Sequence, residues 1–141
     1  MATALLALAS LVSPASQPLP DVQAMGAWIR WLPADLPAAG YMTLTNTGAV
    51  PAVFVGAGSP DFGQITLHRT RTVQGVKGMV PVDSVTVAPG ASVDFAAQGY
   101  HLMLMQSRRA VHPGDRVLVT LRFANGGSID ASFEVRAVAA D

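Results

Sequence analysis

Short apolar runs alternate with clusters of turn residues along most of this chain. Residues 41–46, YMTLTN, alternate between large apolar and polar side chains and end at Asn46-Thr47-Gly48, a sequence that favours a turn. Ala88-Pro89-Gly90 and Asn125-Gly126-Gly127 separate other runs in the same way. A period of two places successive side chains on opposite faces, so these runs predict β-strands with one buried face.

Nine runs of this kind predict nine strands. They cover residues 22–31, 41–46, 51–56, 64–71, 82–87, 92–95, 100–105, 117–123 and 128–135. The segment VQGVKG, residues 73–78, is predicted to be a short glycine-containing connection of the kind that hairpins use. Turn residues recur about every ten positions, which predicts an all-β sandwich or small barrel of about eight to nine short strands. No internal repeat is visible, so we expect one domain.

The first twenty residues have the character of a processing segment. The apolar run at residues 4–12 is too short to span a bilayer, and Ser13 and Ala15 occupy positions suited to signal cleavage. No lysine or arginine precedes this run, which leaves a disordered or packed tail, or a misassigned start, as alternatives. We expect residues 1–20 to be a signal peptide and proline-rich lead-in, residues 21–141 to form the domain, and the protein to be exported.

Composition narrows the classes of function. Nine basic residues balance nine acidic ones with no run of either sign, so the chain lacks the charge pattern of a nucleic-acid or anionic-membrane binder. Cysteine is absent, which excludes a disulfide framework, a thiolate nucleophile, a thiolate zinc site and a blue-copper electron-transfer centre. Hydrophobic residues make up 50% of the chain, which is typical of a folded domain.

Residues suited to catalysis are sparse. His112 lies in VHPGD, a turn sequence, and is expected to be a solvated loop residue. The chain has no G-x-S-x-G elbow, no phosphate-binding loop and no H-E-x-x-H motif, and its acidic residues are scattered. These features favour a protein that is not an enzyme.

Residues 100–106, YHLMLMQ, combine histidine and methionine in one apolar run. In a strand, His101, Met103 and Met105 share a face, and the intervening leucines point the other way. From spacing alone, the simpler interpretation is a methionine-rich core strand with a satisfied histidine. The chemistry favours a metal site, because imidazole and thioether without thiolate or carboxylate form a soft, neutral ligand set that selects Cu(I).

Four residues bear a specific spacing, H-x(10)-M-x(21)-H-x-M. They are His68, Met79, His101 and Met103. This arrangement resembles the signature of the periplasmic copper chaperones of the PCuAC family. Its surroundings are similar as well, namely AGYMTLTNTG (39–48), GMVPVDSVTVAPGASVDF (78–95), GYHLMLMQ (99–106) and PGDRVLVTLRFANGGSIDASFEV (113–135). The likeness spans about residues 22–135.

The resemblance implies a cupredoxin-like Greek-key β-sandwich that binds one Cu(I) per chain through those four residues. It implies a carrier in the periplasm, or on the extracellular side of a bacterial membrane, that delivers copper by ligand exchange. The expected recipient is the copper-centre subunit of cytochrome c oxidase or another copper chaperone. A copper-buffering protein and a metal-free interaction module of the cell envelope remain the alternative interpretations.

The chain departs from the family pattern just after the first histidine. Members often carry a methionine just after the first histidine, whereas Arg69, Thr70 and Arg71 follow His68 here. In a strand both arginines face away from His68, and the simpler interpretation is a solvated strand face. Weaker retention of the metal and docking of an acidic partner are the alternatives. Met105 lies outside the pattern and is expected to be a core or supporting residue, with a role as substitute ligand left open by the face it shares with His101 and Met103.

Overall fold

A computed structural model of the chain describes residues 17–18, 21–33 and 36–137. The strands are β1 (Gln17–Pro18), β2 (Val22–Trp31), β3 (Ala38–Asn46), β4 (Ala52–Gly58), β5 (Phe62–Val73), β6 (Val76–Pro81), β7 (Val85–Val87), β8 (Ser92–Phe95), β9 (Tyr100–Ser107), β10 (Arg116–Phe123) and β11 (Gly127–Ala137). The described residues contain no helix, and hence none that could cross a bilayer. The predicted all-β class is confirmed, and the described residues form eleven strands in place of the eight to nine expected.

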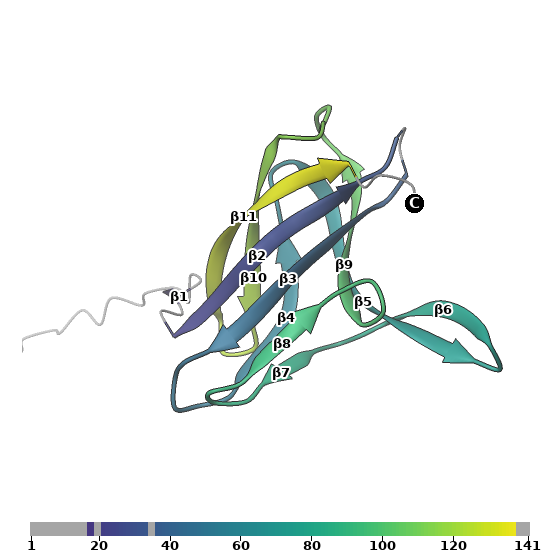
Figure 1. Cartoon of the computed structure of the whole chain (residues 1–141). Helices are drawn as coiled ribbons and strands as arrows, with labels where there is room; N and C mark the ends of the chain where they lie inside the picture. Colours follow the sequence, from purple (N-terminus) through teal and green to yellow (C-terminus); the bar gives the residue numbers. More distant parts are fainter. Residues whose placement is uncertain (1–16, 19–20, 34–35, 138–141) are drawn as a thin grey trace, which may run out of the picture.

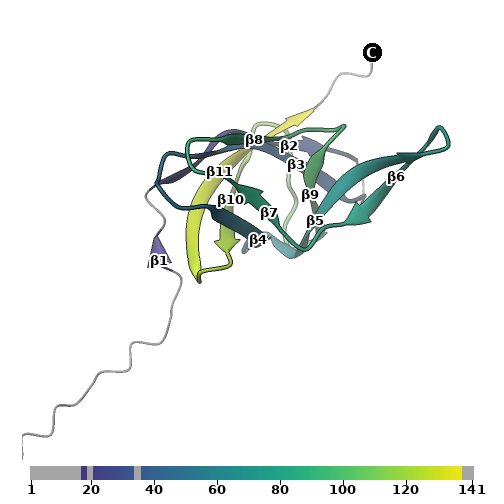
Figure 2. The same cartoon turned by 90° about the horizontal axis from the view of Figure 1, so that it is seen from below.

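The strands form one continuous sheet in the order β6-β5-β9-β8-β3-β2-β11-β10-β4-β7. Strand β9 also pairs with β3, and β1 pairs with β11. The sheet curves back on itself, so that β4 and β7 lie across from β2 and β3 and a β-sandwich results (Figures 1 and 2). Strands β6 and β7 are the two ends of this order, so each keeps one unpaired edge.

The interior of the sandwich follows the predicted alternation. In β10 the inward positions are buried and apolar, and the positions between them face solvent; the inward residues are Val117, Val119, Leu121 and Phe123. The Phe54 ring meets the rings of Phe95 and Phe123 at centroid distances of 5.7 Å. Phe95 in turn packs against Tyr100, the first residue of β9, at a centroid distance of 5.7 Å.

Residues 76–81 correct one prediction. Of the predicted connection, residues 73–78, Val73 ends β5, Gln74-Gly75 form the turn, and residues 76–78 belong to β6. Both turn residues have positive φ, 51° and 76°, as in a type I′ turn, whose twist suits two adjacent strands. The glycines of VQGVKG suggested a loop, but Gly78 fits within an edge strand. As a result β5 and β6 form a long hairpin that projects beyond the sandwich (Figures 1 and 2).

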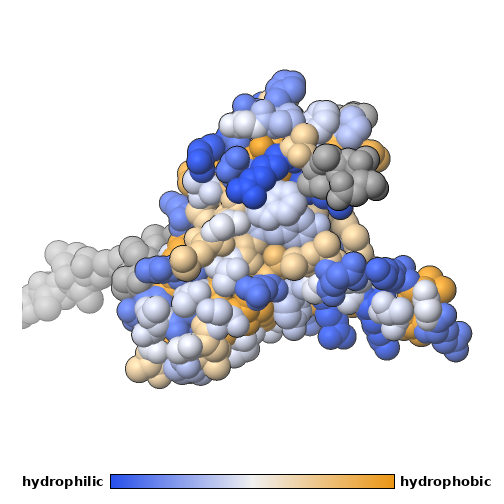
Figure 3. All heavy atoms as spheres, in the orientation of Figure 1, coloured by the Kyte–Doolittle hydropathy of each residue, from blue (hydrophilic) through white to orange (hydrophobic). Residues whose placement is uncertain are grey.

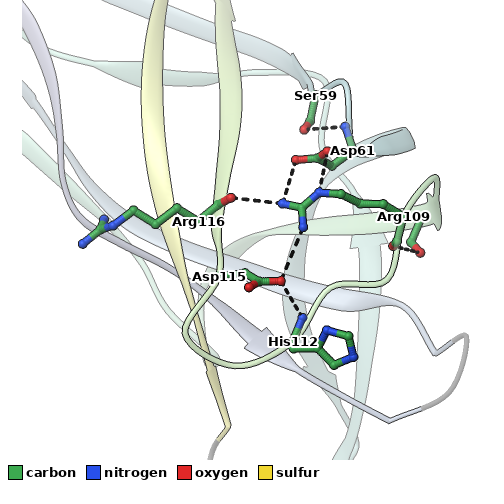
Figure 4. A network of polar contacts seen from close by, with 7 residues as sticks. Ser59, Asp61, Arg109, His112, Asp115 and Arg116 are labelled. Atoms are coloured by element: carbon green, nitrogen blue, oxygen red, sulfur yellow. Dashed lines mark hydrogen bonds and ion pairs between the residues drawn. The ribbon is translucent and has the colours of Figure 1, made fainter.

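A polar network holds the loop between β9 and β10 against the start of β5 (Figure 4). The Arg109 guanidinium donates to both carboxylate oxygens of Asp61, at 2.8 and 3.2 Å, and to Asp115 at 3.4 Å. The backbone N–H of His112 donates to Asp115 at 2.9 Å. This hydrogen bond, with Arg109, lowers the pKa of Asp115. The His112 side chain itself is exposed, as predicted.

The N-terminal prediction falls largely on residues outside the described part of the chain. Residues 1–16 and 19–20, which include the expected apolar run and cleavage positions, are not described. The signal peptide, the cleavage site and the domain boundary at residue 21 stay predictions.

Candidate metal centre

Strands β6, β5 and β9 form a three-stranded ribbon that carries all four predicted ligands. His68 on β5 lies directly opposite His101 on β9. Directly opposite residues of an antiparallel pair share a face, with Cβ atoms about 4.5–5.5 Å apart. The two imidazoles, 33 positions apart in sequence, are therefore neighbours. Their ring centroids are 5.9 Å apart, and the planes are almost perpendicular at 88°.

The environment of His101 fixes which ring nitrogen is available. His101 is only 2% exposed, and its Nδ1 lies 3.3 Å from the Gly99 carbonyl oxygen. A carbonyl accepts but does not donate, so Nδ1 carries the hydrogen and Nε2 keeps a free lone pair. Second-sphere contacts of this kind orient metal-binding histidines.

Three buried side-chain atoms lack a hydrogen-bond partner in the described part of the chain, and all three lie at this place. They are Thr66 Oγ1, His68 Nδ1 and His101 Nε2. A buried polar group without a partner costs about 1–3 kcal/mol. Thr66 lies two residues before His68 on β5, so Thr66, His68 and the opposite residue His101 all lie on one face of the ribbon. Two of the three atoms are imidazole nitrogens, which fits the first two ligands of a soft metal ion.

Electrostatics keep His68 ready to bind a cation. Burial, and then repulsion from the neighbouring His101, lower the pKa of His68 below its usual value. The neutral imidazole therefore predominates at pH 7, and only that form coordinates a metal.

The two methionines flank His68 diagonally. Met103, on β9, is partly buried and lies opposite Thr66. Met79, on β6, lies opposite Thr70 and is 58% exposed. Diagonal neighbours are about 7–8 Å apart, within reach of long side chains. The structure thus brings His68, His101 and Met103 together and leaves the Met79 side chain in solvent at the margin.

The donor set at this place is neutral. Among the described residues no group of three or more histidine, cysteine, aspartate or glutamate side chains is close enough to hold a metal. Any metal held here would therefore depend on thioethers, which favour Cu(I) over zinc, calcium or magnesium.

Comparison with known sequences shows to which protein family the chain belongs. Residues 22–135 match a family described as "Putative lipoprotein LpqE-like". The chain belongs to the LpqE-like family. It is 32% identical over 129 residues to "Putative lipoprotein Lxx21020" of Leifsonia xyli subsp. xyli, a match that covers 87% of this chain and 77% of that protein. A second relative, the uncharacterized protein RP573 of Rickettsia prowazekii, is 34% identical over 87 residues, 61% of this chain and 48% of that protein.

Solved structures confirm the fold of this LpqE-like protein and its resemblance to the PCuAC family. The CuI-DR1885 solution structure from Deinococcus radiodurans has a TM-score of 0.67 and 30% identity, over 87% of this chain and 83% of that one. The copper-bound PCuAC domain from PmoF2 has a TM-score of 0.69 at 23% identity, over 84% of this chain and 94% of that one. The predicted cupredoxin-like sandwich is therefore the observed one.

Met105, the leucines of β9 and Thr66 lie near the candidate ligands of the LpqE-like protein. Met105 shares the face of Met103 but lies opposite Gln64, beside a cavity lined by Leu36 and Phe62. The Gln64–Met105 pair lies four residue pairs along the ladder from the His68–His101 pair. The intervening leucines of β9 are buried in the core. Thr66 was not singled out from the sequence, and its position two residues before His68 is the signal that could have identified it.

Proposed function

We propose that this LpqE-like protein is a copper(I) chaperone of the bacterial cell envelope, and that it is not an enzyme. One Cu(I) is bound per chain, and the ligands are His68, Met79, His101 and Met103. The ion is cargo that passes to a recipient by exchange of ligands. The relatives described as lipoproteins support an envelope location, and the copper-bound structures of similar domains support the cargo.

One observation carries the proposal. Two buried imidazole nitrogens without partners, on rings 5.9 Å apart, belong to residues on the same face of the β-ribbon. A folded protein rarely leaves two such atoms side by side, because each costs free energy that a bound cation would recover. The adjacent Met103 thioether supplies a soft third donor.

The position of Met79 suggests how the ion is released. Met79 is exposed and lies on β6, in the outer strand of the hairpin, whereas His101 and Met103 lie on β9 and His68 pairs with β9. Copper binding would draw Met79 over the site, and an incoming thiolate or imidazole would displace this weak, accessible donor first. The buried His101 and the partly buried His68 would hold the ion until a second recipient ligand arrives. Such a stepwise route suits delivery to the binuclear copper centre of cytochrome c oxidase or to another chaperone.

An anaerobic Cu(I) titration against a competing chelator tests the proposal. We expect one equivalent to bind wild type and none of that affinity to survive in His101→Ala or Met103→Leu. His112→Ala and Met25→Leu are matched controls, because they remove an exposed histidine and an exposed methionine away from the ribbon. Unchanged binding in both ligand variants would contradict the proposed site.

A mixing experiment separates a carrier from a buffer. Copper-loaded protein is combined with a copper-free soluble domain of the oxidase copper-centre subunit, and the two are separated by chromatography. A chaperone yields copper to that domain, whereas a storage protein retains it.

A further inference from the structure

The hairpin of β5 and β6 extends beyond the body of the sandwich as an arm, residues 69–80 (Figures 1 and 2). Apart from Thr70 and Val80, which are partly buried, its side chains are exposed. A two-stranded ribbon without a packed face is only marginally stable in water. Its projection therefore calls for a role other than packing.

The arm is cationic in a chain that is neutral overall. It contains Arg69, Arg71 and Lys77, and residues 62–81 contain no aspartate or glutamate. The ion pairs within the described part of the chain join Arg109 to Asp61 and Asp115, and Arg136 to Glu134. None of these involves the arm, so its three charges are available to a partner.

The arm also exposes apolar side chains among these charges. Val73 is 51% exposed and Val76 71%, and they lie opposite each other across the turn. Figure 3 shows apolar atoms at the end of the arm, bordered by hydrophilic ones. Exposed apolar surface with a polar rim is typical of a contact site between proteins.

The two faces of the arm divide these features. Cross-strand register and the period of two place Arg69, Arg71, Val73 and Val76 on the face opposite to His68 and Met79. Lys77 lies on the face of His68 and Met79. Strand β6 also ends the sheet, so its outer backbone groups are unpaired. A partner bound to this face and edge lies on the other side of the ribbon from the proposed copper ligands, and leaves these ligands accessible.

We infer that the arm is the docking surface for an acidic segment of a protein that exchanges copper with this chain. Charge complementarity selects this occupant, because a second copy would bring two cationic arms together. The role in copper exchange rests on the function proposed above, whereas the docking of an acidic segment does not.

Two synthetic peptides test the inference. Both carry a Cys-x-x-x-Cys pair and a fluorophore, and they differ only in four flanking residues, which are glutamate in one and glutamine in the other. Binding to the copper-free full chain is measured by fluorescence anisotropy at low and at physiological ionic strength. We expect the glutamate peptide to bind about tenfold more tightly at low ionic strength, with the preference reduced by salt.

Paired charge reversals locate the contact. Arg69→Glu with Arg71→Glu should abolish the preference for the glutamate peptide. Arg30→Glu with Arg108→Glu changes the net charge equally at two exposed arginines outside the arm, and should retain it. Circular dichroism and thermal melting check that both variants fold. Equal affinity for the two peptides, or an equal loss in the two variants, overturns the inference.

Copper transfer distinguishes this inference from the proposed function. The chain is incubated with Cu(I), and transfer to each peptide is followed by stopped flow. If the glutamate peptide docks on the arm but no copper is bound or passed, the docking surface stands and the chaperone proposal fails. If copper passes equally fast to both peptides, the chaperone proposal stands and the docking inference fails.

Discussion

Replacement of His101 by leucine separates a metal ligand from a structural core histidine. The imidazole is almost completely buried and makes one long hydrogen bond, from Nδ1 to the Gly99 carbonyl at 3.3 Å, while Nε2 has no partner. Leucine has a similar volume and no polar atom, so His101→Leu removes the unpaired nitrogen and fills the same space. We therefore expect the copper-free protein to become more stable and to lose copper binding.

The magnitude follows from two opposing terms. Removal of the unpaired nitrogen gains about 1–3 kcal/mol, and loss of the hydrogen bond to Gly99 costs about 0.5–1.5 kcal/mol. The Gly99 carbonyl also accepts the backbone N–H of Thr70 at 3.1 Å, so it keeps a partner in the variant. The net expectation is a gain of about 1 kcal/mol in the free energy of unfolding. Copper should instead stabilise wild type, by about 4 kcal/mol when the free ion is 1,000 times its Kd.

Urea denaturation of the copper-free and copper-loaded forms measures both effects. Wild type should gain stability with Cu(I) and His101→Leu should not, and His112→Leu serves as a control at an exposed position. A satisfied core histidine would behave in the opposite way. If copper-free His101→Leu is less stable than wild type by about 1 kcal/mol or more, the ligand interpretation of this residue is refuted.

Three further predictions concern the ribbon and its arm. Met79→Leu should leave the stability of the copper-free protein within about 0.5 kcal/mol of wild type, because the side chain is 58% exposed. The same variant should weaken Cu(I) affinity about tenfold without abolishing it. A chelator titration measures the affinity, and loss of all Cu(I) binding would contradict the marginal role of Met79. Copper affinity should be constant near pH 7 and fall as pH drops below about 6.5, because the pKa of His68 is lowered and protons compete for its imidazole only in acid. The copper-free protein should lose stability over the same acid range, since the unfolded state binds the proton more readily. A decline in copper affinity that begins above pH 7 would contradict the lowered pKa. Gln74→Asn should raise the melting temperature slightly, because asparagine adopts the positive φ of the Gln74-Gly75 turn more readily than glutamine; calorimetry tests this, and a lower melting temperature would be evidence against the type I′ geometry.

The sequence determined the class of fold and the chemistry of the candidate site. Alternation in β10 places its apolar residues inside the sandwich as predicted, because the period of two is a property of the local backbone. The absence of cysteine and the spacing of the four ligand-type residues indicated a Cu(I) site. These inferences need only residue types and their order.

The tertiary structure decided which residues meet. That His68 lies opposite His101 depends on the register of β5 with β9, and a shift of one residue would turn one ring to the other face. The two-residue turn at Gln74-Gly75, which makes β6 a strand and the hairpin an arm, depends on two positive φ angles that glycine alone did not signal. The unpaired Nε2 of His101 and the exposure of Met79 are consequences of packing between strands distant in sequence. Local pattern cannot specify such properties, because register and burial are set by the pairing partner.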